Sequence, residues 1–128
     1  IERYAKTIQI EANLMVELFR TQILPAALLD QKRRAESVKS LIDLGLKPKV
    51  FAIEQFANAI EAANAAIDEV EKVQIQSADF GWEAKGKTYA ELLIPKMEEA
   101  RDAVDKLETL VDNSLWPLPK YREMLFVL

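Results

Sequence analysis

The acidic side chains near residue 100 are the first place in this sequence where chemistry could occur. Glu98, Glu99 and Asp102 lie close together, and carboxylates on facing helices hold pairs of metal ions when Glu-x-x-His motifs complete the ligand set. The 128-residue chain contains no histidine. Helical spacing also places these three carboxylates on the solvent side of their helix. We therefore expect no metal site, no cofactor-binding residue and no catalytic residue in this chain.

The absence of two residue types, histidine and cysteine, limits the kinds of function that this chain can have. Histidine is the usual general base near neutral pH and a common zinc or iron ligand, so its absence disfavours catalysis by this chain alone. There is no cysteine, which excludes disulfides and thiolate metal sites and fits a cytoplasmic location. The net charge is −4, and the basic cluster 32–34 is short, flanked by acidic residues and expected to form a solvated helix face. We therefore predict no nucleic-acid partner.

Length and hydropathy predict one domain without a membrane span. At 128 residues and 50% hydrophobic content, the chain can bury one core. The apolar run 23–29 is far shorter than the roughly 20 residues that cross a bilayer, and it contains Pro25. The chain begins with Ile1 and shows no signal peptide, so we expect a fragment from the end of a longer polypeptide.

Composition and periodicity predict an all-α fold. Ala, Leu, Glu and Lys are abundant and there are three glycines, a composition that favours helices. The first helix is predicted over about 2–42, with a kink at Pro25. Its apolar residues recur at spacings of three and four: Tyr4, Ile8, Ala12, Met15, Phe19, Ile23, Ala26 and Leu29. Gly45 suits a left-handed C-terminal cap, and Pro48 suits the first turn of a second helix over 48–75.

The third helix is predicted over 86–112, after a looser connection at 76–87. Thr88 and Glu91 have the spacing of a capping box. Three helices with short connections predict an elongated up-down-up bundle. Pro25 and Pro95 lie equally far from the predicted ends of their helices, so we expect two kinks at one height, beside the alanines of 62–66. In the second helix, Asp68 and Lys72 have the spacing of an ion pair.

A second apolar face on the first helix suggests a docking surface. Ile10, Leu14 and Leu18 lie beside the main stripe, and a helix that is apolar on two faces requires cover on both. We expect these side chains to pack on protein that precedes Ile1 in the longer chain. Their exposure in an isolated structure would support that hypothesis.

The tail, residues 113–128, differs from the rest of the chain. Pro117 and Pro119 push the residues before them out of helical geometry, so an extended Pro-rich strap is predicted. The aromatic residues of the tail are Trp116, Tyr121 and Phe126. Two alternatives remain for them: they close the core of the bundle, or they form a patch for a partner subunit.

The same tail carries a family resemblance. Residues 107–126, which contain the run Trp-Pro-x-Pro-x-Tyr, resemble the C-terminal signature of the large, type III glutamine synthetases. Residues 3–12 and 22–26 are similar to the family's entry into its C-terminal helices and to its helix-breaking segment. The resemblance implies a parent enzyme of nitrogen assimilation that joins ammonia to glutamate using ATP and Mg or Mn, in ring-shaped homo-oligomers.

The catalytic residues of that family lie upstream, and none can be carried onto this chain. The resemblance therefore implies a non-catalytic C-terminal helical domain with a structural or assembly role. Its partners would be the upstream catalytic domain of the same chain and other subunits. The alternative is a stand-alone helical adaptor that binds partner helices, which the two-faced first helix permits.

Overall fold

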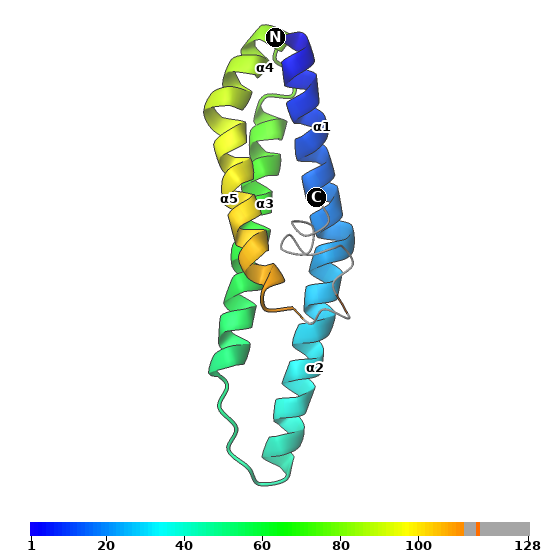
Figure 1. Cartoon of the computed structure of the whole chain (residues 1–128), viewed down its shortest axis with the longest axis vertical. Coiled ribbons are helices and arrows are strands. Elements are labelled where there is room, and N and C mark those ends of the chain that lie inside the picture. The colour runs from blue at the N-terminus through cyan, green and yellow to red at the C-terminus, as the bar shows by residue number, and fades with distance from the viewer. Residues whose placement is uncertain (112–114, 116–128) are drawn as a thin grey trace, which may run out of the picture.

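The computed structural model describes residues 1–111 and 115, and within them the chain is all-helical, without a strand. The all-α prediction is confirmed for this part of the chain. Seven helical segments follow one another in three rods (Figure 1). The first rod consists of α1, η1 and α2, the second of α3, and the third of α4, η2 and α5. They are α1 (Glu2–Leu18), η1 (Phe19–Ile23), α2 (Leu24–Asp43), α3 (Phe51–Gln76), α4 (Trp82–Thr88), η2 (Tyr89–Leu93) and α5 (Ile94–Glu108).

Each proline-containing rod widens into a π-helix just before its proline. The π-helical segments η1 and η2 are five residues long, and Pro25 and Pro95 each occupy the second position of the α-helix that follows. Proline lacks an N–H, and its ring clashes with a carbonyl of the preceding turn, so a wider turn accommodates it without ending the helix. The rods therefore continue through their prolines.

The connection between α2 and α3 begins with the cap that the sequence predicts. Gly45 has φ +86°, and its amide donates to the Ile42 carbonyl at 2.9 Å, while the Leu46 amide donates to the Leu41 carbonyl at 3.0 Å. These two bonds define a Schellman motif. The next helix begins at Phe51 rather than at Pro48, because the carbonyl of Val50 is the one that accepts from the amides of the first helical turn.

The start of the third rod differs from the prediction. Helix α4 begins at Trp82, with Gly81 in extended geometry as its N-cap. Thr88 lies inside the continuous rod, so the predicted capping box there is wrong. Gly86 does not break the helix. It is buried, and a Cβ at this position would lie 2.8 Å from Cγ2 of Ile1. This glycine therefore serves the close approach of α4 to α1.

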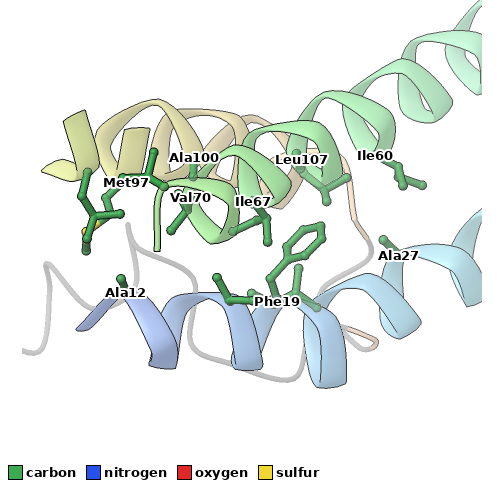
Figure 2. Close-up of a cluster of buried hydrophobic side chains, with 14 of the residues drawn as sticks. Ala12, Phe19, Ala27, Ile60, Ile67, Val70, Met97, Ala100 and Leu107 are labelled. Atoms are coloured by element: carbon green, nitrogen blue, oxygen red, sulfur yellow. The ribbon is translucent and has the colours of Figure 1, made fainter. Parts of the chain in front are cut away.

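The core lies where α3 packs against both other rods. Figure 2 shows side chains of α1 and α2 meeting those of α3 and α5. The buried hydrophobic residues are Ala5, Ala12, Val16, Phe19, Ile23, Ala27, Phe56, Ile60, Ala63, Ile67, Val70, Val73, Tyr89, Leu93, Met97, Ala100, Leu107 and Val111. Helix α5 ends part of the way along the molecule, so that, among the described residues, only α2 and α3 form the end that carries the 44–50 connection (Figure 1).

The two prolines do not share one height. The Tyr89 hydroxyl donates to Gln9, and the Arg34 guanidinium donates to the Leu110 carbonyl. A residue of the third rod therefore lies level with the residue 80 or 76 positions earlier in the first rod. Pro25 and Pro95 are 70 positions apart, so they would lie level only if this offset between the two rods were 70 residues. The difference of 6 to 10 residues corresponds to roughly 9–15 Å at 1.5 Å per residue. The expected common waist is therefore replaced by two staggered π-helical segments.

Candidate docking surface

An apolar groove runs between α1 and α5, with α3 as its floor; we call it the α1–α5 groove. Its volume is about 370 Å³. The lining residues are Glu11, Leu14, Met15, Leu18, Phe19, Ile23, Ile67, Met97, Ala100, Arg101, Val104 and Asp105. Figure 2 shows Phe19, Ile67 and Ala100 among the side chains of the core beneath it.

The α1 wall contains the residues that the sequence singled out. Leu14 and Leu18 line the groove, and Ile10 lies one turn before Leu14 on the same face. The exposed fractions are 66% for Ile10 and 51% for Leu14, whereas Leu18 is partly buried. Two of the three side chains thus lie open to solvent beside an apolar groove. Their contact with further protein stays a prediction.

The rim of the groove carries charges of both signs. Glu11 lies on the α1 wall, and Arg101 and Asp105 lie on the α5 wall. Burial, reinforced by the charge of Asp102 and opposed by that of Arg101, raises the pKa of Asp105 above its usual value. A partner that brought a cation to this rim would favour the ionised form of Asp105. The groove is therefore suited to an apolar segment with basic flanks.

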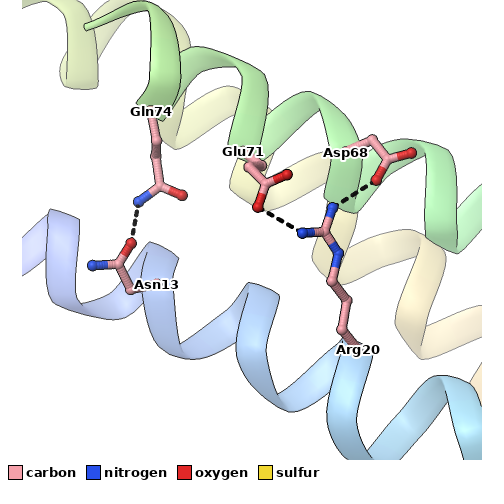
Figure 3. Close-up of polar contacts among 5 residues, drawn as sticks. All are labelled: Asn13, Arg20, Asp68, Glu71 and Gln74. Atoms are coloured by element: carbon pink, nitrogen blue, oxygen red, sulfur yellow. Dashed lines mark hydrogen bonds and ion pairs between the residues drawn. The ribbon is translucent and has the colours of Figure 1, made fainter. Parts of the chain in front are cut away.

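Polar contacts on the outer side hold α1 and η1 against α3, and so fix one wall of the groove (Figure 3). Arg20 donates to Glu71 at 2.6 Å and to Asp68 at 2.8 Å, and these two hydrogen bonds raise the pKa of Arg20. One turn after Glu71 on α3, Gln74 donates to Asn13 at 2.7 Å. Asp68 thus bonds a residue 48 positions away. Local spacing had predicted Lys72 as its partner instead.

A second cluster fixes the end of α5 and was also missed from the sequence. The Arg34 guanidinium donates to the Asp30 carboxylate through two bonds of 3.1 Å and to the Leu110 carbonyl. It also lies 4.2 Å from the centre of the Phe56 ring. Sequence reasoning assigned the whole basic cluster to a solvated face. The available signal was the spacing of Asp30 and Arg34, four residues apart on the buried side of α2.

The remaining predicted residues fall into two groups. Pro25 and Pro95 are exposed, on the surface of their rods. Five others lie outside the described residues: Trp116, Pro117, Pro119, Tyr121 and Phe126. Within residues 1–111 and 115, no group of three or more acidic side chains is arranged to hold a metal ion. None of the described helices is long and apolar enough to cross a membrane.

Comparison with known proteins assigns the family. Residues 1–41 match the model of the glutamine synthetase C-terminal domain. The chain is 36% identical over 135 residues to the type-3 glutamine synthetase of Dictyostelium discoideum, and 30% identical over 137 residues to a glutamine synthetase of Bacteroides fragilis (strain YCH46). Each alignment covers 98% of this chain but 18% of the relative. No solved structure matches.

The all-helical fold and these matches define a glutamine synthetase C-terminal domain, and the chain belongs to that family. Within the family it is the C-terminal helical domain of the type-3 form, which confirms the resemblance found in the tail. The chain spans less than a fifth of the length of the relatives that it matches.

Proposed function

We propose that this chain is the non-catalytic C-terminal part of a larger, cytoplasmic glutamine synthetase. Its role is to support the folding or assembly of that enzyme. The parent joins ammonia to glutamate with ATP and Mg or Mn, as a homo-oligomer, and its catalytic groups lie upstream. The bundle is up-down-up, with a Pro-rich strap after α5. The observation that carries the proposal is the open apolar surface formed by Ile10, Leu14 and the α1–α5 groove.

The proposed occupant of this surface is the upstream catalytic part of the same polypeptide. The relatives are more than five times longer than the aligned region, and the upstream chain would enter at Ile1, the head of the helix that forms the groove wall. Ile10 lies only about 14 Å from that entry at 1.5 Å per residue. Covalent attachment at this distance gives a high effective concentration, so weak contacts suffice for docking.

The exposed side chains can supply the required free energy. Full burial of a Leu or Ile side chain contributes roughly 1.5–3 kcal/mol. Ile10 and Leu14 retain 66% and 51% of their surface, so covering both would contribute about 2–3 kcal/mol. That is about 30- to 150-fold in a docking equilibrium, because each 1.4 kcal/mol is tenfold.

The test uses the full-length enzyme that carries this domain. Leu14→Asp places a charge beside the α1–α5 groove, and Leu92→Asp is the matched control, because Leu92 is 52% exposed and lies outside the groove. Light scattering measures the oligomer mass, and a glutamine-formation assay measures the rate. We expect Leu14→Asp alone to lower the mass or the rate.

The two readouts separate the possible roles. A fall in mass assigns the domain to assembly, whereas a fall in rate at constant mass assigns it to positioning the catalytic part. Equal behaviour of the Leu14→Asp and Leu92→Asp enzymes would contradict docking through this surface. Normal mass and rate in an enzyme that lacks residues 1–128 would contradict the structural role altogether and would leave the adaptor alternative.

A further inference from the structure

The first rod begins with different residue types from the other two rods. Glycine and proline favour turns and mark the boundaries of helices. The second rod follows Gly45 and Pro48, and the third follows Gly81, which is the N-cap of α4 in extended geometry. The N-cap of α1 is Ile1, whose side chain has no hydrogen-bonding atom, and Ile is among the least favoured residues at this position. The residue types at the start of α1 therefore give a helix no reason to begin there.

The backbone at Ile1 already has the bonding of a helix. The Ile1 carbonyl accepts from the Ala5 amide at 2.8 Å, which is the first bond of the α-helical series. The amides of Glu2, Arg3 and Tyr4 have no carbonyl four positions earlier within the described part of the chain. Three further residues in helical geometry before Ile1 would supply those carbonyls.

Continuation of α1 costs less free energy than the start of a separate helix. The first turn of a helix fixes three residues for one hydrogen bond, whereas each later residue adds a bond of its own. Nucleation therefore disfavours a separate helix by a factor of roughly 250 to 1,000. Helix α1 is already formed and packed on the core through the buried Ala5 and Ala12. Residues that precede Ile1 would thus extend an existing helix.

A continued helix would leave the end of the bundle. The hydrogen bond between Tyr89 and Gln9 places residues of the first and third rods level at an offset of 80. Helix α4 begins at Trp82 and therefore starts level with Glu2. Figure 1 shows the N-terminus and α4 at the same end of the molecule. Residues before Ile1 would consequently project beyond α4, toward the upstream part of the enzyme.

The end of the bundle that this helix would leave carries exposed apolar surface. A groove of about 730 Å³ lies between α1 and α4, and its lining residues are Ile1, Tyr4, Gly81, Glu83, Ala84, Gly86 and Lys87. The exposed fraction is 72% for Ile1, 44% for Tyr4 and 44% for Phe80 in the connection before α4. Apolar side chains gathered in this way are typical of a contact with further protein. The upstream part is the protein that the chain itself brings to this end.

We propose that α1 is the C-terminal portion of a longer helix that begins before Ile1, and that this continuous helix joins the upstream part of the enzyme to the bundle. The inference rests on the proposed place of the chain at the C-terminal end of a longer polypeptide, which the 18% coverage of the relatives supports. A continuous helix fixes both distance and rotation, since each residue advances 1.5 Å and turns by about 100°. The α1–α5 groove, whose wall is the same helix, is thereby held in one orientation to the upstream part.

Amide hydrogen exchange in the full-length enzyme tests this continuity. We expect the amides of Glu2, Arg3 and Tyr4 to exchange at least tenfold more slowly than those of an unstructured chain, as the amide of Ala5 does. Protection of all three is required, because a capping side chain before Ile1 would protect only one or two of them. Exchange at the unstructured rate beside a protected Ala5 amide would overturn the proposal, and so would protection confined to one of the three.

A proline substitution gives a second, independent measurement. Proline is tolerated at the first position of a helix, whereas inside a helix it removes a hydrogen bond and clashes with the preceding turn. In the full-length enzyme, Glu2→Pro should speed exchange at Arg3 and Tyr4 at least tenfold relative to Glu2→Ala. The alanine variant controls for the 3.6 Å ion pair between Glu2 and Lys6. Equal exchange in the two variants would place Glu2 at the start of the helix and contradict continuity.

These measurements are separate from the test of docking through the α1–α5 groove. A Leu14→Asp enzyme with normal mass and rate would contradict docking, yet protected amides at residues 2–4 would still support the continuous helix. Unprotected amides at residues 2–4 in an enzyme that is sensitive to Leu14→Asp would contradict the continuous helix alone.

Discussion

The side chain of Arg34 connects three helices, and its removal should be costly. The guanidinium binds Asp30 on its own helix through two bonds of 3.1 Å and donates to the carbonyl of Leu110, just after α5. Its central carbon lies 4.2 Å from the centre of the Phe56 ring of α3. The Arg34 side chain is 32% exposed, whereas that of Asp30 is 8% exposed. Arg34 therefore ties the end of the third rod to α2.

The cost of Arg34→Ala follows from these contacts. The bond to the carbonyl contributes about 1 kcal/mol, because it exchanges for bonds to water in the unfolded chain. The contact with the ring adds about 1 kcal/mol at a partly buried site, and the ion pair within one helix adds about 0.5 kcal/mol. We therefore expect Arg34→Ala to lower the free energy of unfolding by about 2–3 kcal/mol.

Urea denaturation followed by circular dichroism measures this difference. Arg33→Ala is the control, because it removes the same charge from the adjacent, exposed position of the same helix. Its effect should stay within about 0.5 kcal/mol, as for most surface substitutions. Arg34→Lys should recover less than half of the loss, because lysine keeps the charge but not the planar, two-pronged donor. If Arg34→Ala and Arg33→Ala differ by less than about 0.5 kcal/mol, the reasoning is wrong.

Three further changes can be checked by thermal unfolding. Gly45→Ala should cost about 1–2 kcal/mol, because φ is +86° there and a Cβ disfavours the left-handed region; no change in melting temperature would contradict the strain argument. Tyr89→Phe should cost about 1 kcal/mol through the lost 3.0 Å bond to Gln9, whereas Gln9→Ala in the same background should add little. Asp105 has a raised pKa in the fold, so its contribution to stability is most favourable below about pH 4 and declines as the pH rises through the folded-state pKa. Asp105→Asn should therefore raise the melting temperature at pH 7, and this gain should vanish below about pH 4.

Local patterns predicted the helices well where one residue type decides the backbone. The left-handed cap at Gly45 is an example, because few other residues adopt positive φ without strain. The apolar stripe of the first helix matches the buried side at Ala12 in α1 and at Phe19 and Ile23 in η1, whereas Tyr4 and Leu29, at the two ends of the stripe, are exposed. The same patterns misplaced the start of the third rod, because Thr88 has a capping spacing by coincidence within a continuous helix.

The docking surface was predicted in part. Spacing alone indicated that Ile10 and Leu14 lie off the main stripe, and both are exposed. It could not indicate the groove, because five of the twelve lining residues come from α5, some 80 residues later along the chain. The contacts that position the walls were missed for the same reason, since Arg20 and Arg34 bind partners on other helices.

The sequence by itself determined the helical class, the cap at Gly45 and, through its tail, the family. These depend on interactions between residues within a turn or two of one another, or on a string of residues read directly. Only the tertiary structure decided how the rods are offset, how prolines are accommodated in π-helical segments, and which charged side chains pair. These depend on the fit of whole helix surfaces, in which small shifts of register exchange one set of distant partners for another.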